Sequence, residues 1–255
     1  MNTFIGIDLA WSDRNATGIA VLRSGARGLL VRQVGLAHTL DEIVAVVHEH
    51  ASACMVVMVD APLVVPNLSG RRPCEAALAE VFHAQHAAPY PGNRRLLGAR
   101  QPGGQPRGEA LGERLAAIGF AWPPRALVAG VPGGARLVHE CYPHPAHVRL
   151  FALAQTFKYK RKQGRAWPEL RREFARYCDA LRALRKPAIA WTAALERTFD
   201  VRQAKGRAYK HAEDQLDALC CAYLAALLPS GRLEAFGEPA SGMIVVPRAS
   251  GATAR

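Results

Sequence analysis

The sequence contains no apolar run of about 18 or more residues, the length that a helix needs to cross a bilayer. No secretory leader is expected either, because the acid Asp8 comes before an apolar leader segment could form. The six cysteines show no CxxC spacing and most lie in apolar runs, so we expect them to be reduced and buried. Together these absences predict a soluble cytoplasmic protein.

Acidic residues are also scarce, with 21 Asp and Glu against 33 Lys and Arg, which gives a net charge of +12. This excess of positive charge favours a polyanionic partner, and nucleic acid is the first candidate. The alternative explanation of the excess is an Arg-rich coding bias. Half of the residues are hydrophobic, enough for one large core. We expect one domain over residues 1–247, with loop and helical insertions at about 62–134 and 155–205, and a disordered tail over 248–255.

Two of the scarce acids lie on strands that should be buried. Residues 4–11 are apolar almost without alternation, which predicts a strand buried on both faces, yet they include Asp8. A lone ionised carboxylate there lowers stability unless it is satisfied at a strand end or compensated by a cation. Residues 54–59 are likewise apolar and lead into Asp60. Two acids at one sheet edge favour a site for a divalent cation such as Mg²⁺, which prefers oxygen ligands.

The order of the first elements predicts the fold class. Residues 17–22 and 28–34 should form two more strands of an antiparallel meander, and Thr39 with Glu42 should cap the helix that follows. The strand before Asp60 would then lie parallel to the first strand. The expected fold is α/β, with a mixed five-stranded sheet (a β-β-β-α-β core) flanked by helices and an inserted helical region.

A helix over residues 211–228 should be buried on most of its circumference, because residues 218–228 are all apolar. Asp214 and Asp217 are three residues apart and therefore lie on one side of its first turns. Stabilisation of the helix N-terminus is the simpler interpretation for Asp214. Asp217 shares its face with expected core residues and is the stronger functional candidate.

Two basic segments favour contacts with phosphates. Residues 88–107 form a long irregular segment with several arginines, and residues 157–165 interleave aromatic residues with five cations. A solvated linker is the alternative interpretation of the second segment. The candidate phosphate-binding residues are Arg71, Arg72, Arg94, Arg95, Lys158, Lys160 and Lys162.

In combination the motifs resemble a known family. The stretches that carry the resemblance are Gly6–Trp11, Asp60–Leu63, Arg72–Glu75, Glu140–His144, Lys158–Lys160, Asp214–Leu219 and Gly242–Pro247. Their order is similar to that of the predicted ribonuclease H-like nucleases grouped as domain of unknown function 429, in the ribonuclease H-like superfamily, over nearly the whole chain. The resemblance implies a ribonuclease H-like fold and a metal-dependent nuclease that hydrolyses phosphodiester bonds of DNA or RNA.

The resemblance also implies a set of site residues. Asp8, Asp60 and Asp217 would correspond to the carboxylates of the superfamily, and Asp214 would be a fourth by similarity to Holliday junction resolvases. These acids would hold two Mg²⁺ or Mn²⁺ ions, with Asp8 bridging them. Glu140 would complete the shell or act through water. His144 would either shuttle a proton or pack in a turn.

Three alternatives to a nuclease are open. A zinc site of Cys141, His144 and His147 with His139 is disfavoured, because the chain has no second paired cluster. An actin-like or sugar-kinase type phosphotransferase would need a Gly-rich phosphate loop, which residues 11–18 do not provide. A module that binds nucleic acid without cutting it would not need acids beside its phosphate groove.

Overall fold

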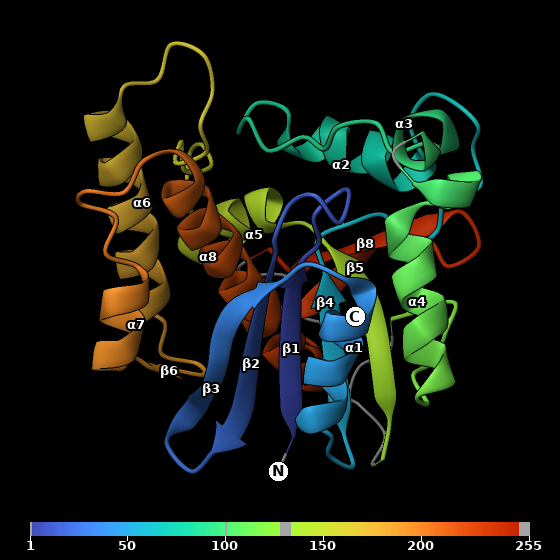
Figure 1. The fold of residues 1–255 in the computed structure, drawn as a ribbon, viewed down its shortest axis with the longest axis horizontal. Coiled ribbons are helices and arrows are strands. Elements are labelled where there is room, and N and C mark those ends of the chain that lie inside the picture. Colours follow the sequence, from blue (N-terminus) through green and yellow to red (C-terminus); the bar gives the residue numbers. More distant parts are fainter. Residues whose placement is uncertain (1, 100, 128–133, 250–255) are drawn as a thin grey trace.

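The fold is organised around one mixed β-sheet with helices against both faces (Figure 1). The computed structural model describes residues 2–99, 101–127 and 134–249. Its strands are β1 (Thr3–Asp8), β2 (Thr17–Gly25), β3 (Gly28–Ala37), β4 (Met55–Val59), β5 (Arg136–Cys141), β6 (Ile189–Ala190), β7 (Leu233–Glu238) and β8 (Gly242–Pro247). Its helices are α1 (Leu40–Glu49), α2 (Pro73–Phe82), α3 (Arg94–Gly98), η1 (Pro102–Gly104), α4 (Arg107–Ala117), α5 (Pro143–Phe151), α6 (Trp167–Arg182), α7 (Ala193–Thr198), α8 (Gly206–Leu227) and η2 (Leu228–Ser230).

The strands lie in the order β6-β3-β2-β1-β4-β5-β8-β7. Strands β1, β2 and β3 form the predicted antiparallel meander. On the other side of β1, strand β4 pairs in parallel, so the predicted parallel pairing of these two strands is confirmed. The sheet is wider than the five strands predicted, because β6 extends one edge and β8 and β7 extend the other.

Parallel pairing brings acids from distant parts of the chain to one edge of the sheet. Strand β1 ends at Asp8, and Asp60 directly follows β4, with its backbone N–H donating to the Ile7 carbonyl oxygen at 2.8 Å. On β5, Glu140 pairs in register with Val59, the last residue of β4. The carboxyl ends of parallel strands are the usual place for a site in such a sheet.

Helix α8 crosses β1 and β2 very closely, and two glycines permit this. A Cβ atom added at Gly6 would lie 2.0 Å from the Ala218 carbonyl oxygen, and one added at Gly18 would lie 2.0 Å from the Asp214 carbonyl oxygen. Only a residue without a side chain fits such contacts. Because Gly18 pairs with Asp8 across the sheet, its contact with α8 brings Asp214 beside Asp8.

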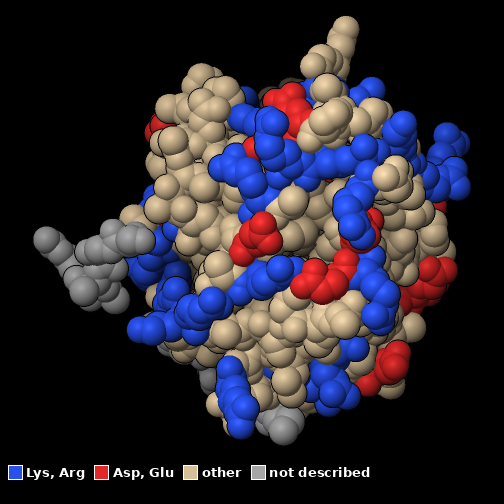
Figure 2. All heavy atoms as spheres, turned by 90° about the vertical axis from the view of Figure 1, so that its left-hand side faces the viewer, with Lys and Arg blue, Asp and Glu red and all other residues tan. Residues whose placement is uncertain are grey.

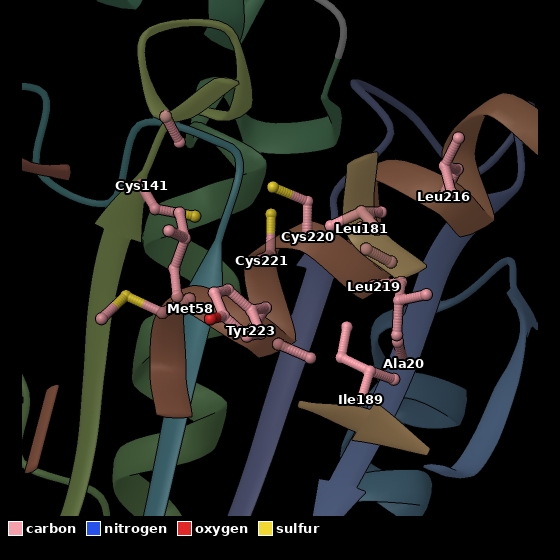
Figure 3. Close-up of a cluster of buried hydrophobic side chains, with 14 of the residues drawn as sticks. Ala20, Met58, Cys141, Leu181, Ile189, Leu216, Leu219, Cys220, Cys221 and Tyr223 are labelled. Carbon is pink, nitrogen blue, oxygen red and sulfur yellow. The ribbon is translucent and has the colours of Figure 1, made fainter. Parts of the chain in front are cut away.

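Two hydrophobic cores lie on the two faces of the sheet, because alternate residues of each strand point to opposite sides. On one face, Leu219 and Cys221 of α8 pack in a cluster with Ala20 of β2 and Met58 of β4 (Figure 3). On the other face, α1 and α4 cover the second cluster. Helix α1 begins with the predicted cap, in which the Thr39 hydroxyl accepts from the Glu42 backbone N–H at 3.1 Å. All six cysteines are free and buried, as predicted.

The remaining helices lie mostly in the two segments predicted as insertions. Residues 62–134 include α2, α3 and α4, and residues 155–205 include α6 and α7. Among the described residues, no helix combines the length and apolar character required to cross a membrane. The predicted tail over 248–255 lies outside the described residues from position 250 on.

We expect Gly18→Ala to lower the free energy of unfolding by at least about 1–3 kcal/mol, because the new methyl group would overlap the backbone of α8. Gly35→Ala on β3 is the matched control, since the nearest atom to its new methyl group, on Gln33, would be 3.8 Å away. Urea denaturation of both variants and of wild type measures the difference. Equal losses in the two variants would contradict the role assigned to Gly18.

Candidate functional site

A cavity of about 790 Å³ opens at the sheet edge where β1 and β4 end. Its walls include the loop after β1, the segment around residues 89–92 and the first turns of α8. Acids and lysines line the same space: Asp8, Asp60, Glu140, Asp214, Lys160, Lys162 and Lys210. Predicted site residues from five separate parts of the chain, around positions 8, 60, 140, 160 and 214, therefore share one cavity.

Asp8 and Asp60 at the ends of β1 and β4 are strongly perturbed. Burial raises the pKa of Asp8 to about 8, and the carboxylates of Asp217 and Asp214 contribute to that rise. Burial also raises the pKa of Asp60 well above its usual range, with Asp8 as the next cause. Oδ2 of Asp8 is buried and has no hydrogen-bond partner among the described residues. Without an added cation, Asp8 holds its proton at neutral pH.

The first acid on α8, Asp214, lies beside Asp8. The Asp8 side chain acts on the pKa of Asp214 as a hydrogen-bond partner, and a hydrogen bond between two carboxyl groups requires a proton on one of them. Lys210, four residues earlier on the same face of α8, pairs with Asp214. Burial raises the pKa of Asp214, whereas Lys210 and the hydrogen bond to Asp8 act in the opposite direction.

The second acid on α8, Asp217, is fully buried and has two partners. The Tyr159 hydroxyl donates to its Oδ1 at 2.5 Å, and the Lys160 Nζ lies 2.8 Å from its Oδ2. Burial lowers the pKa of Lys160, but Asp217, Asp8 and Asp60 outweigh burial and hold that pKa well above its usual range. Lys160, predicted to contact phosphate, therefore compensates Asp217 in this structure, as Lys210 compensates Asp214.

Metal ligation is not preformed at this site. In the part of the chain that the structure describes, no group of three or more His, Cys, Asp or Glu side chains has an arrangement that could hold a metal ion. The zinc alternative gains no support from this geometry, and the rings of His144 and His147 lie 5.9 Å apart between centroids. An ion that binds at Asp217 would compete with the Lys160 ammonium, which already pairs with that carboxylate.

Glu140 lies on the cavity wall but is fully engaged. Its Oε2 accepts from the Leu63 backbone N–H at 3.0 Å and from Arg72 Nη1 at 2.8 Å, and its Oε1 accepts from Arg72 Nη2 at 2.6 Å. Arg72 also donates to Glu75 at 2.8 Å, and Glu75 in turn accepts from the Gly92 backbone N–H at 3.0 Å. This buried network joins β5, α2 and the segment at residue 92. Glu140 thus anchors the wall, and its catalytic role stays a prediction.

His144 lines the cavity and is held by one neighbour. Its Nδ1 lies 3.1 Å from the Tyr142 hydroxyl, and its Nε2 is buried without a partner among the described residues. Burial, followed by the charge of Lys160, lowers the pKa of His144 well below its usual range. The imidazole is therefore neutral, and its surroundings oppose protonation.

The predicted phosphate-binding residues divide into exposed and buried ones. Arg72 is only 1% exposed and lies in the network with Glu140, so the structure places it away from the surface. Apart from Lys160, the others lie at or near the surface: Arg71, Arg94, Arg95, Lys158 and Lys162.

Four residues of the site were missed from the sequence: Glu75, Tyr159, Lys210 and Glu213. Glu213 is 2% exposed and lies 3.3 Å from Lys210 in an ion pair. Lys210 lies three residues before Glu213 and four before Asp214. This spacing on a helix indicates ion pairs, so it could have identified Lys210 from the sequence. Tyr159 lies between two predicted lysines, and Glu75 is three residues after Arg72, but neither pattern alone reveals a buried partner.

We expect the contribution of Asp8 to the stability of the wild type to fall as pH rises from about 4 to about 8 when no divalent ion is present. The folded protein keeps the Asp8 proton up to about pH 8, whereas the unfolded chain loses it near the usual pKa of 3.8. Over this interval the folded state binds more protons, so rising pH favours unfolding. Asp8→Asn takes up no such proton, so the wild type should lose stability relative to this variant over the same interval. Urea denaturation in EDTA measures both slopes, and identical slopes would contradict the burial of a protonated Asp8.

Lys160→Met should lower the free energy of unfolding by about 3 kcal/mol, because removal of one partner leaves Asp217 buried without a counter-charge. Added Mg²⁺ should then stabilise this variant more than it stabilises wild type, because no ammonium competes for the acids. Thermal denaturation with Mg²⁺ and with EDTA gives both quantities. Lys162→Met, at an exposed position of the same cavity, is the control. The same Mg²⁺ response in both variants would count against competition at Asp217.

The fold and the cavity define a mixed α/β protein with buried carboxylates and lysines gathered at one edge of its sheet. The model of the family described as Protein of unknown function (DUF429) matches residues 6–241, so the chain belongs to this family. Comparison with curated proteins and with solved structures gives no match.

Proposed function

We propose that the protein is a divalent-metal-dependent nuclease that hydrolyses phosphodiester bonds of nucleic acid. The observation that carries the proposal is the gathering of Asp8, Asp60 and Asp214 at one cavity, with the buried Asp217 close enough for its charge to raise the pKa of Asp8 and of Asp60. Burial of so many carboxyl groups lowers stability unless cations compensate them. A fold without a use for these acids would be more stable with apolar residues in their place.

The order of the central strands supports a ribonuclease H-like fold. Antiparallel β3, β2 and β1 are followed by parallel β4 and β5, and α8 packs against β1. This is the arrangement that the resemblance in the sequence implies. On this proposal, the eight-stranded sheet is that core widened by β6 at one edge and by β8 and β7 at the other.

The oxygen chemistry of the acids suits Mg²⁺ or Mn²⁺, although their side chains would have to rearrange to ligate an ion, because no metal-holding group is preformed among the described residues. Carboxylate oxygens are the ligands that these hard cations prefer, and Oδ2 of Asp8 has no hydrogen-bond partner in the described part of the chain. Asp8, Asp60, Asp214 and Asp217 would hold two ions, as the resemblance implies. When bound, such ions supply an activated water and stabilise the leaving oxygen.

Side chains around the acids have separate tasks in this proposal. The Tyr159 hydroxyl fixes the orientation of Asp217. The neutral His144 has a buried Nε2 without a partner among the described residues, and this atom would take up a proton only if the negative charge of a bound phosphate offset the effects that lower its pKa. Lys160 lines the cavity and, once released from Asp217, contacts a phosphate of the substrate.

One observation favours a second candidate, a module that binds nucleic acid without cleaving it. The Lys160 ammonium already compensates Asp217 without a metal ion. If that pair persists when Mg²⁺ is present, the acids serve to position Lys160 for phosphate binding and perform no hydrolysis. The two candidates differ in whether any substrate is cut.

A panel of labelled single-stranded, duplex, hybrid and branched substrates, incubated with Mg²⁺ or Mn²⁺, tests the proposal. We expect wild type to cleave at least one of them and EDTA to abolish cleavage. Asp8→Asn and Asp217→Asn should each reduce cleavage by at least about 100-fold, more than the loss of an outer partner of a metal ligand usually does, and should retain binding.

Asp41→Asn is the matched control for this panel, because the Asp41 side chain is 83% exposed on α1 and forms a surface ion pair with Arg114. It should cleave at the wild-type rate. Binding without cleavage across the whole panel would overturn the nuclease and favour the binding module. Cleavage that survives both Asp8→Asn and Asp217→Asn would overturn the assignment of those acids.

A further inference from the structure

Two aromatic side chains at the cavity are not explained by the acids. Trp11 is 46% exposed and Tyr90 is 69% exposed. Among the large hydrophobic side chains that are exposed in the described residues, these two are the aromatic ones, and both line the cavity. Exposed apolar surface concentrated at a cavity is typical of a surface that contacts a ligand.

The loop that carries Trp11 is held in place by distant residues. The Trp11 carbonyl oxygen accepts from Gln101 Nε2 at 2.7 Å, and the carbonyl oxygen of the preceding Ala10 accepts from Arg107 Nη1 at 3.1 Å. Only two residues separate Trp11 from Asp8 at the end of β1. The backbone that carries the ring is therefore held close to the acids.

Tyr90 is held by the other wall of the cavity. The Lys162 Nζ lies 3.3 Å from the Tyr90 hydroxyl and 5.7 Å from the centroid of its ring, within the range of a cation–π contact. Two residues further on, the Gly92 backbone N–H donates to the buried Glu75. The Tyr90 ring thus lies on an anchored segment and has the Lys162 ammonium beside it. A ring and a cation side by side can contact a base and its phosphate together.

We infer that the cavity takes unpaired nucleotides, with nucleobases stacked on Trp11 and Tyr90 and the intervening phosphate directed to the acids. This inference rests on the proposed function. Every base has a flat face that stacks on an aromatic ring, whereas the bases of a duplex are paired and stacked on one another and do not reach side-chain rings. The substrate class is therefore a single strand, or a single-stranded end or loop, and not a continuous duplex.

The size of the cavity supports the same substrate class. Its volume of about 790 Å³ lies within the ~300–1,000 Å³ range of pockets that enclose a small ligand. A single-stranded segment enters such a space, whereas a duplex only lies across its mouth. Basic side chains extend the charge beyond the cavity: Figure 2 shows Lys and Arg in bands over the face that carries α6 and α7, where Arg172, Arg176, Arg182, Arg197 and Arg202 are exposed.

Binding measurements test the inference without relying on cleavage. Fluorescence anisotropy in Mg²⁺, in the Asp8→Asn background, compares a labelled single strand of mixed sequence with a hairpin duplex of the same sequence. Trp11→Ala and Tyr90→Ala should each weaken single-strand binding by about 5- to 100-fold, the loss expected from one stacked base. Trp11→Phe and Tyr90→Phe should restore most of the affinity, and duplex binding should not change.

Leu30→Ala on β3 is the control, because it removes another exposed apolar side chain (43% exposed) that is not part of the cavity lining. It should bind as the parent does. Single-strand binding that depends on both rings, in a protein that cleaves no substrate, would uphold this inference and overturn the nuclease. Cleavage confined to duplexes, or single-strand binding unaffected by both alanine variants, would overturn this inference and leave the nuclease intact.

Discussion

The close packing of α8 against β1 and β2 is the constraint on which the site depends. Gly6 and Gly18 leave room for the helix backbone at contacts where a Cβ atom would lie 2.0 Å from a carbonyl oxygen. The same packing brings Asp214 beside Asp8, and it removes the acids from water. Removal from water raises the pKa values of Asp8, Asp60 and Asp214, so the acids need a cation, which Lys160 provides at Asp217.

Two groups of buried acids lie near the cavity, and their hydrogen bonding distinguishes them. Both oxygens of Glu140 are paired with Arg72, and one also accepts a backbone N–H, so no further ligand is required there. Asp8, in contrast, has a buried oxygen without a partner among the described residues. An unsatisfied carboxylate oxygen costs stability and is retained more readily where it serves a ligand. The anchor and the candidate site are thus distinct although they share one cavity.

The sequence predicted the elements whose signals are local. Uninterrupted apolar strands that end at acids located Asp8 and Asp60, and the long apolar run of α8 indicated that Asp217 is buried. Contacts between distant residues carried no such signal. Arg72 pairs with Glu140, 68 residues away, and Lys160 lies in a basic segment that resembles a solvated surface. The sequence therefore did not reveal the buried partners of Arg72 and Lys160, and both cations were assigned to phosphate contacts. The width of the sheet was also missed, because β6 has two residues and pairs only through the tertiary fold.

Anomalous scattering from Mn²⁺ in crystals of the wild-type protein tests most directly whether the acids form a metal site. We expect Mn²⁺ between the carboxylates of Asp8, Asp60, Asp214 and Asp217, with the Lys160 ammonium moved away from Asp217. Crystals equilibrated with Mn²⁺ that contain no anomalous peak at these residues, and in which Lys160 still pairs with Asp217, would contradict the site.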